Sequence, residues 1–389
     1  MLQSIHKNIF MFPVRREISE LYVSIAIKAL ACSMIAVFEP VFLYKIFNSI
    51  ERVVFFYLIV YLANFFLLPL GGKLASKCGF EHCIMYSIPF VIIYLFILYQ
   101  IKSHHALYWI APLILASYKT IYWPAQHTDM AHYGNSRQRG AEVSFYYFLN
   151  AVINIIGPLA GGFIIAFFGF KALFAIASAI LFMSAIPLFT SNEKFEAQDF
   201  SYVKAMKRFF KPYATYTRRA EIAFLGLGAD FIGMICWPIF IFLVIGDYRI
   251  MGALVTLSLL VTAIATLLIG KAIDKRKGDM ILKGSVILYF FIWIFRYFFP
   301  TTAGVFAVDF LDRNFGNGIF LPFRTYTFEE GKKRGHLKFI VFSEMGLAFA
   351  KVLAAAVLLL ALHYINSWFV IFFIAGVFSL FFLFLPVTN

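Results

Sequence analysis

The chain has 389 residues, of which 62% are hydrophobic and only 14% are charged, and its mean hydropathy is +0.83. Soluble globular domains contain about 25% charged residues, so this composition excludes an ordinary soluble domain and indicates a membrane protein. The net charge of +14 could indicate a nucleic-acid partner, but the positions of the basic residues give it another origin.

About twelve apolar blocks follow one another along the chain, separated by short polar clusters. A stretch of about 20 apolar residues is long enough to cross a bilayer as a helix. The first six blocks are 18–44, 53–70, 83–101, 107–125, 143–168 and 172–188. The second six are 222–245, 251–269, 281–298, 303–322, 339–362 and 368–385. The sequence therefore predicts an all-α polytopic membrane protein with about 12 transmembrane helices in two groups of six.

Most lysines and arginines lie on one side of these blocks. The amino terminus and the loops after every second block hold 24 of the 34, counting Lys283 at the edge of the ninth block, whereas the alternate loops hold five. Positive charge is retained on the cytoplasmic side of a membrane. The bias predicts cytoplasmic termini in a protein integral to the cell membrane. It also explains the net charge without a nucleic-acid partner.

Several other features are expected to be absent. The first block is too long for a cleavable signal peptide and lacks a small-residue cleavage site. The four cysteines form no CxxC pair and lie outside the predicted external loops, so we expect free thiols. The sequence has no GxxxxGK[ST], HExxH or GxSxG motif. We therefore expect no metal, no cofactor and no catalytic set, and an ion gradient as the energy source.

Two pairs of matching loops indicate an internal duplication. The loops after blocks 2 and 8 both begin with Gly-Lys, at Gly72 and Gly270, and both carry a lysine five positions later, at Lys77 and Lys275. The second pair is Arg139-Gly140 before block 5 and Arg334-Gly335 before block 11. The offsets of 198 and 195 residues are nearly equal. The sequence therefore predicts a six-helix bundle over 1–190, a cytoplasmic linker over 191–220 and a second bundle over 221–389. Such bundles can rock around a site at the membrane midplane.

Over its whole length, the chain resembles members of the major facilitator superfamily. Members of that family have twelve spans in two halves, cytoplasmic termini, a long central loop, and a glycine/aspartate/basic signature after spans 2 and 8. The signature matches Gly72, Lys77 and Gly79 in the first half, and Gly270, Asp274 and Lys275 in the second. Ser76 occupies the aspartate position of the first copy, where the family's aspartate helps to latch the inward gate. Asp129 and Arg139 flank the loop after block 4, as in many members.

Block 5 contains an element similar to the GPxxGG element of the proton-coupled drug-efflux branch. The matching residues are Gly157, Pro158, Gly161 and Gly162. A proline with small neighbours lets a helix bend and pack closely. Block 4 lacks the embedded arginine that is typical of efflux members, and its only basic residue is Lys119.

Ten charged residues fall inside the predicted spans, away from the span edges where Glu20 and Lys283 lie. They are Lys28, Glu39, Lys119, Asp230, Arg296, Asp309, Asp312, Arg313, Glu344 and Lys351. Each costs about 2.5–3.5 kcal/mol at the bilayer centre when uncompensated. We therefore expect most of them to be paired or to face a polar cavity between the halves.

Helical spacing indicates which of these charges share a helix face. The pairs on one face are Lys28 with Glu39, Glu344 with Lys351, and Asp309 with Arg313. Asp230 and Lys119 have no partner in their own blocks and could meet across the cavity. Arg296, near the outer end of its block, is expected to extend to the headgroups.

One or more of the acids is expected to bind a coupling proton, because burial favours the neutral form of a carboxyl group. Asp230 and Glu39 are the first candidates, followed by Asp312. The alternative is that these acids form ion pairs that only hold the helices in register.

These features favour a secondary active transporter that works by alternating access, with proton-coupled export of amphiphilic compounds as the leading hypothesis. The alternative is import of a sugar, peptide or organic anion, in which Lys28, Lys119 and Lys351 would bind an anionic solute. A membrane enzyme acting on lipid-linked substrates is less favoured, since the external loops are short. We expect a monomer whose partners are the bilayer and a small solute.

Overall fold

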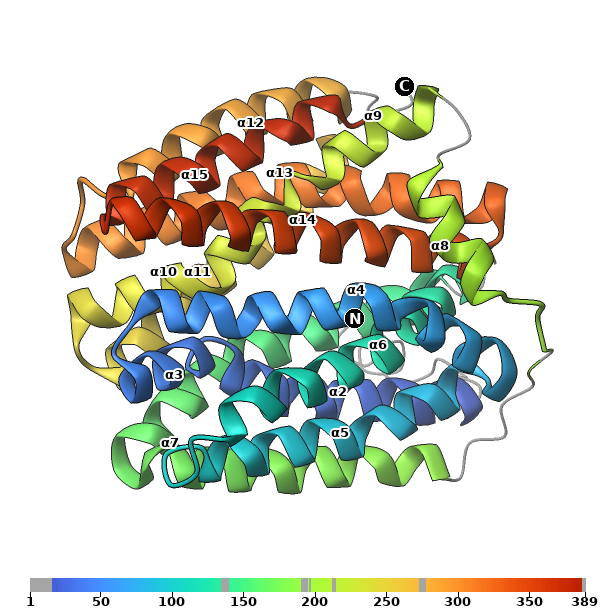
Figure 1. Ribbon diagram of the computed structural model, residues 1–389, viewed down its shortest axis with the longest axis horizontal. Helices are drawn as coiled ribbons and strands as arrows, with labels where there is room; N and C mark the ends of the chain where they lie inside the picture. The colour runs from blue at the N-terminus through green and yellow to red at the C-terminus, as the bar shows by residue number, and fades with distance from the viewer. Residues whose placement is uncertain are drawn as a thin grey trace, which may run out of the picture.

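The computed structural model describes residues 16–133, 140–189, 195, 197–211, 215–272 and 278–386, and every regular element they form is helical (Figure 1). The first half contains α2 Arg16–Ala36, α3 Glu39–Phe47, α4 Ile50–Cys78, α5 Phe80–Gln100, α6 Leu107–Tyr133 and α7 Gly140–Phe189. A linker helix, α8 Tyr202–Phe210, follows. The second half contains α9 Thr215–Phe224, α10 Leu227–Ile245, α11 Tyr248–Ala272, α12 Gly278–Phe295, α13 Thr302–Arg334, α14 His336–Tyr364, α15 Trp368–Leu380 and the 3₁₀ helix η2 Phe381–Phe384.

The helices follow the predicted blocks, with three differences. Block 1 breaks between α2 and α3, where Pro40 begins a new helix, and block 7 breaks between α9 and α10. Blocks 5 and 6 run together as α7 across a bend at Gly169, whose φ of 79° suits a glycine. Among the described residues, six helical stretches are long and apolar enough to cross a membrane, and one of them spans both parts of α7. The remaining predicted spans are shorter or more polar.

The two halves pack against each other, with most of the first half below and most of the second half above in Figure 1. Across the interface, α4 packs against α14 and α7 packs against α11. The second spans are α4 and α11, and the fifth spans are the first part of α7 and α14. Exchanging the halves therefore turns one contact into the other, as the predicted duplication requires.

The interface has two ends. One end contains the α4–α5 turn at Gly79, the α13–α14 turn at Gly335, and α8; we call it the basic end. The opposite end has the α10–α11 turn at Gly246. Residues 72–78 belong to α4, so the predicted loop beginning at Gly72 is helical. A Cβ on Gly72 would meet Val341 of α14 at 2.7 Å, which shows how closely the halves approach at the basic end.

The 157–162 element packs α7 tightly on two sides. A Cβ at Gly157 or Gly161 would overlap α2, and one at Gly162 would overlap the backbone of Tyr248 in α11. The carbonyl of Pro158 also lies against α11. Small residues therefore let α7 approach both its own half and the other half.

Candidate functional site

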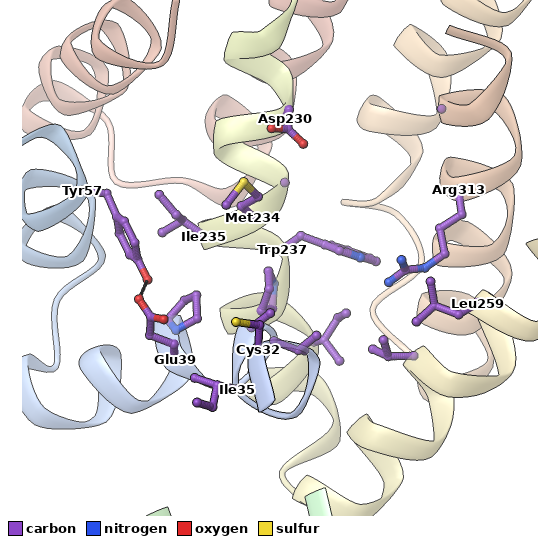
Figure 2. Close-up of a pocket in the computed structure, with 18 of the residues that line it drawn as sticks. Cys32, Ile35, Glu39, Tyr57, Asp230, Met234, Ile235, Trp237, Leu259 and Arg313 are labelled. Atoms are coloured by element: carbon purple, nitrogen blue, oxygen red, sulfur yellow. Dashed lines mark hydrogen bonds between the residues drawn. The ribbon is translucent and has the colours of Figure 1, made fainter. Parts of the chain in front are cut away.

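A cavity of about 560 Å³ lies between the halves, with walls from α2 to α7 on one side and α10 to α13 on the other (Figure 2). Six of the nine predicted cavity residues lie on its wall: Glu39, Lys119, Asp230, Asp309, Asp312 and Arg313. Three do not line it: Lys28, Glu344 and Lys351. Most of the remaining wall is aromatic or aliphatic.

In the second half, Asp309 and Arg313 form the ion pair that their i,i+4 spacing predicted, at 2.8 Å. Asp309 is buried, and it also accepts a hydrogen bond of 2.8 Å from Nε1 of Trp237. Its carboxylate is therefore held by a cation and by a neutral donor.

Asp312 forms an ion pair with Arg296 of the α12–α13 connection. The guanidinium lies between two indole rings, 4.2 Å from the centroid of Trp237 and 3.5 Å from that of Trp293. Arg296 is only 1% exposed, so the prediction that it extends to the headgroups is wrong. The acid and the two aromatic faces provide an internal site for the cation.

Asp230 forms a 2.7 Å ion pair with Lys351 of α14. The Asp230 side chain remains 34% exposed and faces the cavity, whereas Lys351 is buried. The Lys351 ammonium also donates to the hydroxyl of Tyr61 in α4, at 3.4 Å. The prediction that Asp230 meets Lys119 across the cavity is therefore wrong. Lys351, which was predicted to share a helix face with Glu344, pairs with Asp230.

In the first half, Glu39 is held by tyrosines. Its Oε1 accepts a hydrogen bond from Tyr57 at 2.6 Å (Figure 2). It also accepts one from Tyr94 at 2.7 Å. Among the described residues, no basic side chain forms an ion pair with it. Lys28, which was predicted to share a helix face with Glu39, contacts tyrosine rings and forms no ion pair with Glu39, and a break between α2 and α3 separates the two residues.

The two lysines of the first half contact aromatic rings. The Lys119 ammonium lies 5.4 Å from the ring centroid of Tyr61 and has no carboxylate partner among the described residues. Lys28 is 2% exposed and lies over the rings of Tyr118 and Tyr122. Its ammonium has no hydrogen-bond partner in the described part of the chain.

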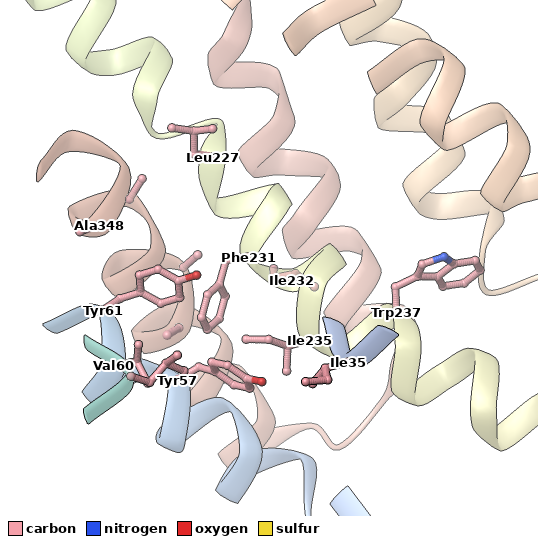
Figure 3. Close-up of a cluster of buried hydrophobic side chains, with 14 of the residues drawn as sticks. Ile35, Tyr57, Val60, Tyr61, Leu227, Phe231, Ile232, Ile235, Trp237 and Ala348 are labelled. Atoms are coloured by element: carbon pink, nitrogen blue, oxygen red, sulfur yellow. The ribbon is translucent and has the colours of Figure 1, made fainter. Parts of the chain in front are cut away.

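Contacts between the halves lie at both ends of the interface. At the basic end, Nδ1 of His127 in α6 lies 2.8 Å from Oε1 of Glu344 in α14, within hydrogen-bond distance. At the opposite end, the Lys45 ammonium donates to the Tyr248 hydroxyl at 3.0 Å. Between them, Tyr61 packs on Phe231 with ring centroids 5.8 Å apart (Figure 3). The sequence did not indicate that His127 contacts the other half, because its partner lies 217 residues away.

The predicted gate residues are described only in part. Gly79 joins α4 to α5 with a φ of 94°, and Lys77 is exposed. Ser76 is buried, and its carbonyl accepts a 3.0 Å hydrogen bond from the backbone of Gln198 in the linker. Of the others, Gly270 lies in α11, Asp129 is buried at the end of α6, and Asp274, Lys275 and Arg139 lie outside the described residues.

Comparison with known proteins agrees with this architecture. No curated protein matches the chain. The crystal structure of the nucleoside transporter NupG is similar, with a TM-score of 0.71 over 95% of this chain and 98% of that chain. The sequence identity is 14%, so this similarity shows the fold alone. The family model of the Major Facilitator Superfamily matches residues 21–337. The chain is therefore a membrane-embedded secondary transporter that belongs to the Major Facilitator Superfamily.

Proposed function

We propose that the chain couples transport of a small amphiphilic solute to protons, and that Glu39 binds the proton. One observation carries the proposal: Glu39 is the acid on the described cavity wall that has no cationic partner. Protonating Asp312 or Asp230 would leave Arg296 or Lys351 buried and unpaired, which costs several kcal/mol. Protonating Asp309 would leave the half-buried Arg313 without its partner. Protonating Glu39 leaves only neutral groups, because its partners are tyrosine hydroxyls. It is therefore the acid that exchanges a proton at the lowest cost.

The cavity supports a small amphiphilic solute. Its volume of about 560 Å³ is in the range of small-molecule sites, and its walls combine aromatic rings with a few charged groups. The predicted direction, export, depended on the 157–162 element. That element packs α7 against α2 and α11. Importers need such packing as much as exporters do, so the element does not favour either direction.

The basic end is proposed to face the cytoplasm, since most lysines and arginines in the loops lie there. A reporter enzyme fused after Asn389 should be active in the cytoplasm. An active extracytoplasmic fusion would reverse the orientation.

Infrared titration tests the proton site without a known solute. The purified protein should show the C=O stretch of a protonated carboxyl that appears as the pH falls. The band should be absent in Glu39→Gln and retained in Glu51→Gln, which changes an exposed glutamate at the start of α4. A band that persists in Glu39→Gln and disappears in Asp230→Asn would assign the proton to Asp230.

A further inference from the structure

The charges around the cavity do not cancel. In the second half, three acids and three bases form three ion pairs: Asp230–Lys351, Asp309–Arg313 and Asp312–Arg296. In the first half, one acid, Glu39, is present with two lysines, Lys28 and Lys119. With every lysine counted as protonated, the described groups sum to one positive charge when Glu39 is ionised and to two when Glu39 is protonated.

Lys119 is the cation that an incoming solute would meet. It lies on the cavity wall, is half-buried, and contacts the ring of Tyr61 rather than a carboxylate. The hydroxyl of Tyr61 already accepts from Lys351, so it does not compensate Lys119. An ammonium in this position attracts an anion more strongly than it would in water, because the surroundings screen the charge poorly.

Lys28 adds positive potential behind this wall. It is four residues before Cys32 and seven before Ile35, so it lies on the face of α2 that these two residues present to the cavity. Its ammonium is covered by Tyr118, which is itself part of the wall. A buried cation without an acceptor is costly unless an anion compensates it.

We propose that the transported solute is an organic anion whose charged group binds Lys119, with Lys28 strengthening the attraction from behind Tyr118. The inference rests on the proposed function, and it determines whether the proton and the solute cross the membrane in the same direction or in opposite directions. A cationic solute would compete with the proton for Glu39, as in antiport. An anion binds more tightly after Glu39 is protonated, because the cavity has then gained a positive charge. Proton and anion therefore move together, and an inward proton gradient drives uptake.

Cys32 offers a test that needs no known solute, because this native thiol is part of the cavity wall. In the full chain with the other three cysteines changed to alanine, Cys32 is modified with anionic sulfonatoethyl methanethiosulfonate or with the cationic trimethylammonioethyl reagent. The measured quantity is the rate with the anionic reagent divided by the rate with the cationic reagent. Changes in the reactivity of the thiol affect both rates equally and cancel in this ratio. The anionic reagent should react faster. The ratio should fall about tenfold in Lys119→Gln and rise by a similar factor in Glu39→Gln.

Three controls make the result decisive. Neutral methyl methanethiosulfonate should modify Cys32 at similar rates in all variants, which shows that they are folded. Lys119→Arg keeps the charge and should keep the ratio, as should Lys171→Gln at an exposed lysine. A faster cationic reagent, or a ratio that Lys119→Gln leaves unchanged, overturns the proposal. The labelling rates test the charge of the cavity, and the infrared band tests the proton site. If the anionic reagent reacts faster but the infrared titration shows no carboxyl band from Glu39, only the proposed function is refuted.

Discussion

The two walls of the cavity treat their charges differently. On the second-half wall, every described charge has an ionic partner. In addition, the cation that pairs with Asp312 is buried, and Asp309 accepts a hydrogen bond from a buried tryptophan. On the first-half wall, Glu39 has only tyrosine partners and Lys119 contacts an aromatic ring, as Lys28 does behind the wall. Paired charges are costly to separate, whereas unpaired charges remain available to a proton or a solute. The second half therefore provides a fixed framework, and the first half provides the groups that exchange.

The largest expected effect is on stability, at the buried pair of the second half. Arg296→Met leaves Asp312 without its cation and should lower the free energy of unfolding by about 3–5 kcal/mol. Denaturant titration in micelles measures it. The matched first-half variant, Lys119→Met, breaks no ion pair and should cost less than about 1 kcal/mol. Equal losses in the two variants would contradict the contrast between the walls.

A smaller effect is expected where the halves meet. His127–Glu344 is the histidine–carboxylate contact that joins the two halves among the described residues, and His127 is about one-third exposed. His127→Gln should weaken closure of the basic end by about 1 kcal/mol, which is about fivefold in the open population. Modification of Cys32 by a reagent added at that end should rise accordingly. Lys283→Gln, which removes an exposed pair within one helix, should leave the rate unchanged.

Glu39→Gln should change stability by less than about 1 kcal/mol, because the amide oxygen still accepts from Tyr57 and Tyr94. Thermal unfolding compares it with the parent. A loss as large as that of Arg296→Met would mean that Glu39 is part of the framework.

The smallest effect is expected at the exposed Asp247–Arg249 pair, at the opposite end. The hydrogen bonds from Arg249 hold the pKa of Asp247 at about 2, below its usual 3.8. Because the folded-state pKa is lowered, the pair stabilises the fold above pH 3.8, and this contribution fades as the pH falls toward 2. The pair is exposed, so Asp247→Asn should lower the unfolding temperature only slightly from pH 5 to pH 8, and the unfolding temperatures of the variant and the parent should converge as the pH falls toward 2. A large difference would show that the pair holds the end closed.

The sequence predicted the architecture because the lengths of apolar blocks and the alternation of basic loops are local signals. Asp309–Arg313 was also predictable, since both residues lie within one turn of one helix. The pairs Asp230–Lys351 and His127–Glu344 were not, because each depends on how two distant helices pack. Arg296 lies at the end of α12, where a long side chain usually extends outward, and its inward position depends on Trp237 and Trp293. The predicted bundle boundaries at residues 190 and 221 stay predictions.

Proton-driven accumulation in proteoliposomes tests the central claim most directly. Radiolabelled carboxylates and phosphate monoesters are offered to the parent, Glu39→Gln and Asp230→Asn under an imposed pH gradient. The parent should concentrate at least one anion, and Glu39→Gln should exchange that anion without concentrating it. Accumulation by Glu39→Gln equal to that of the parent would contradict the account.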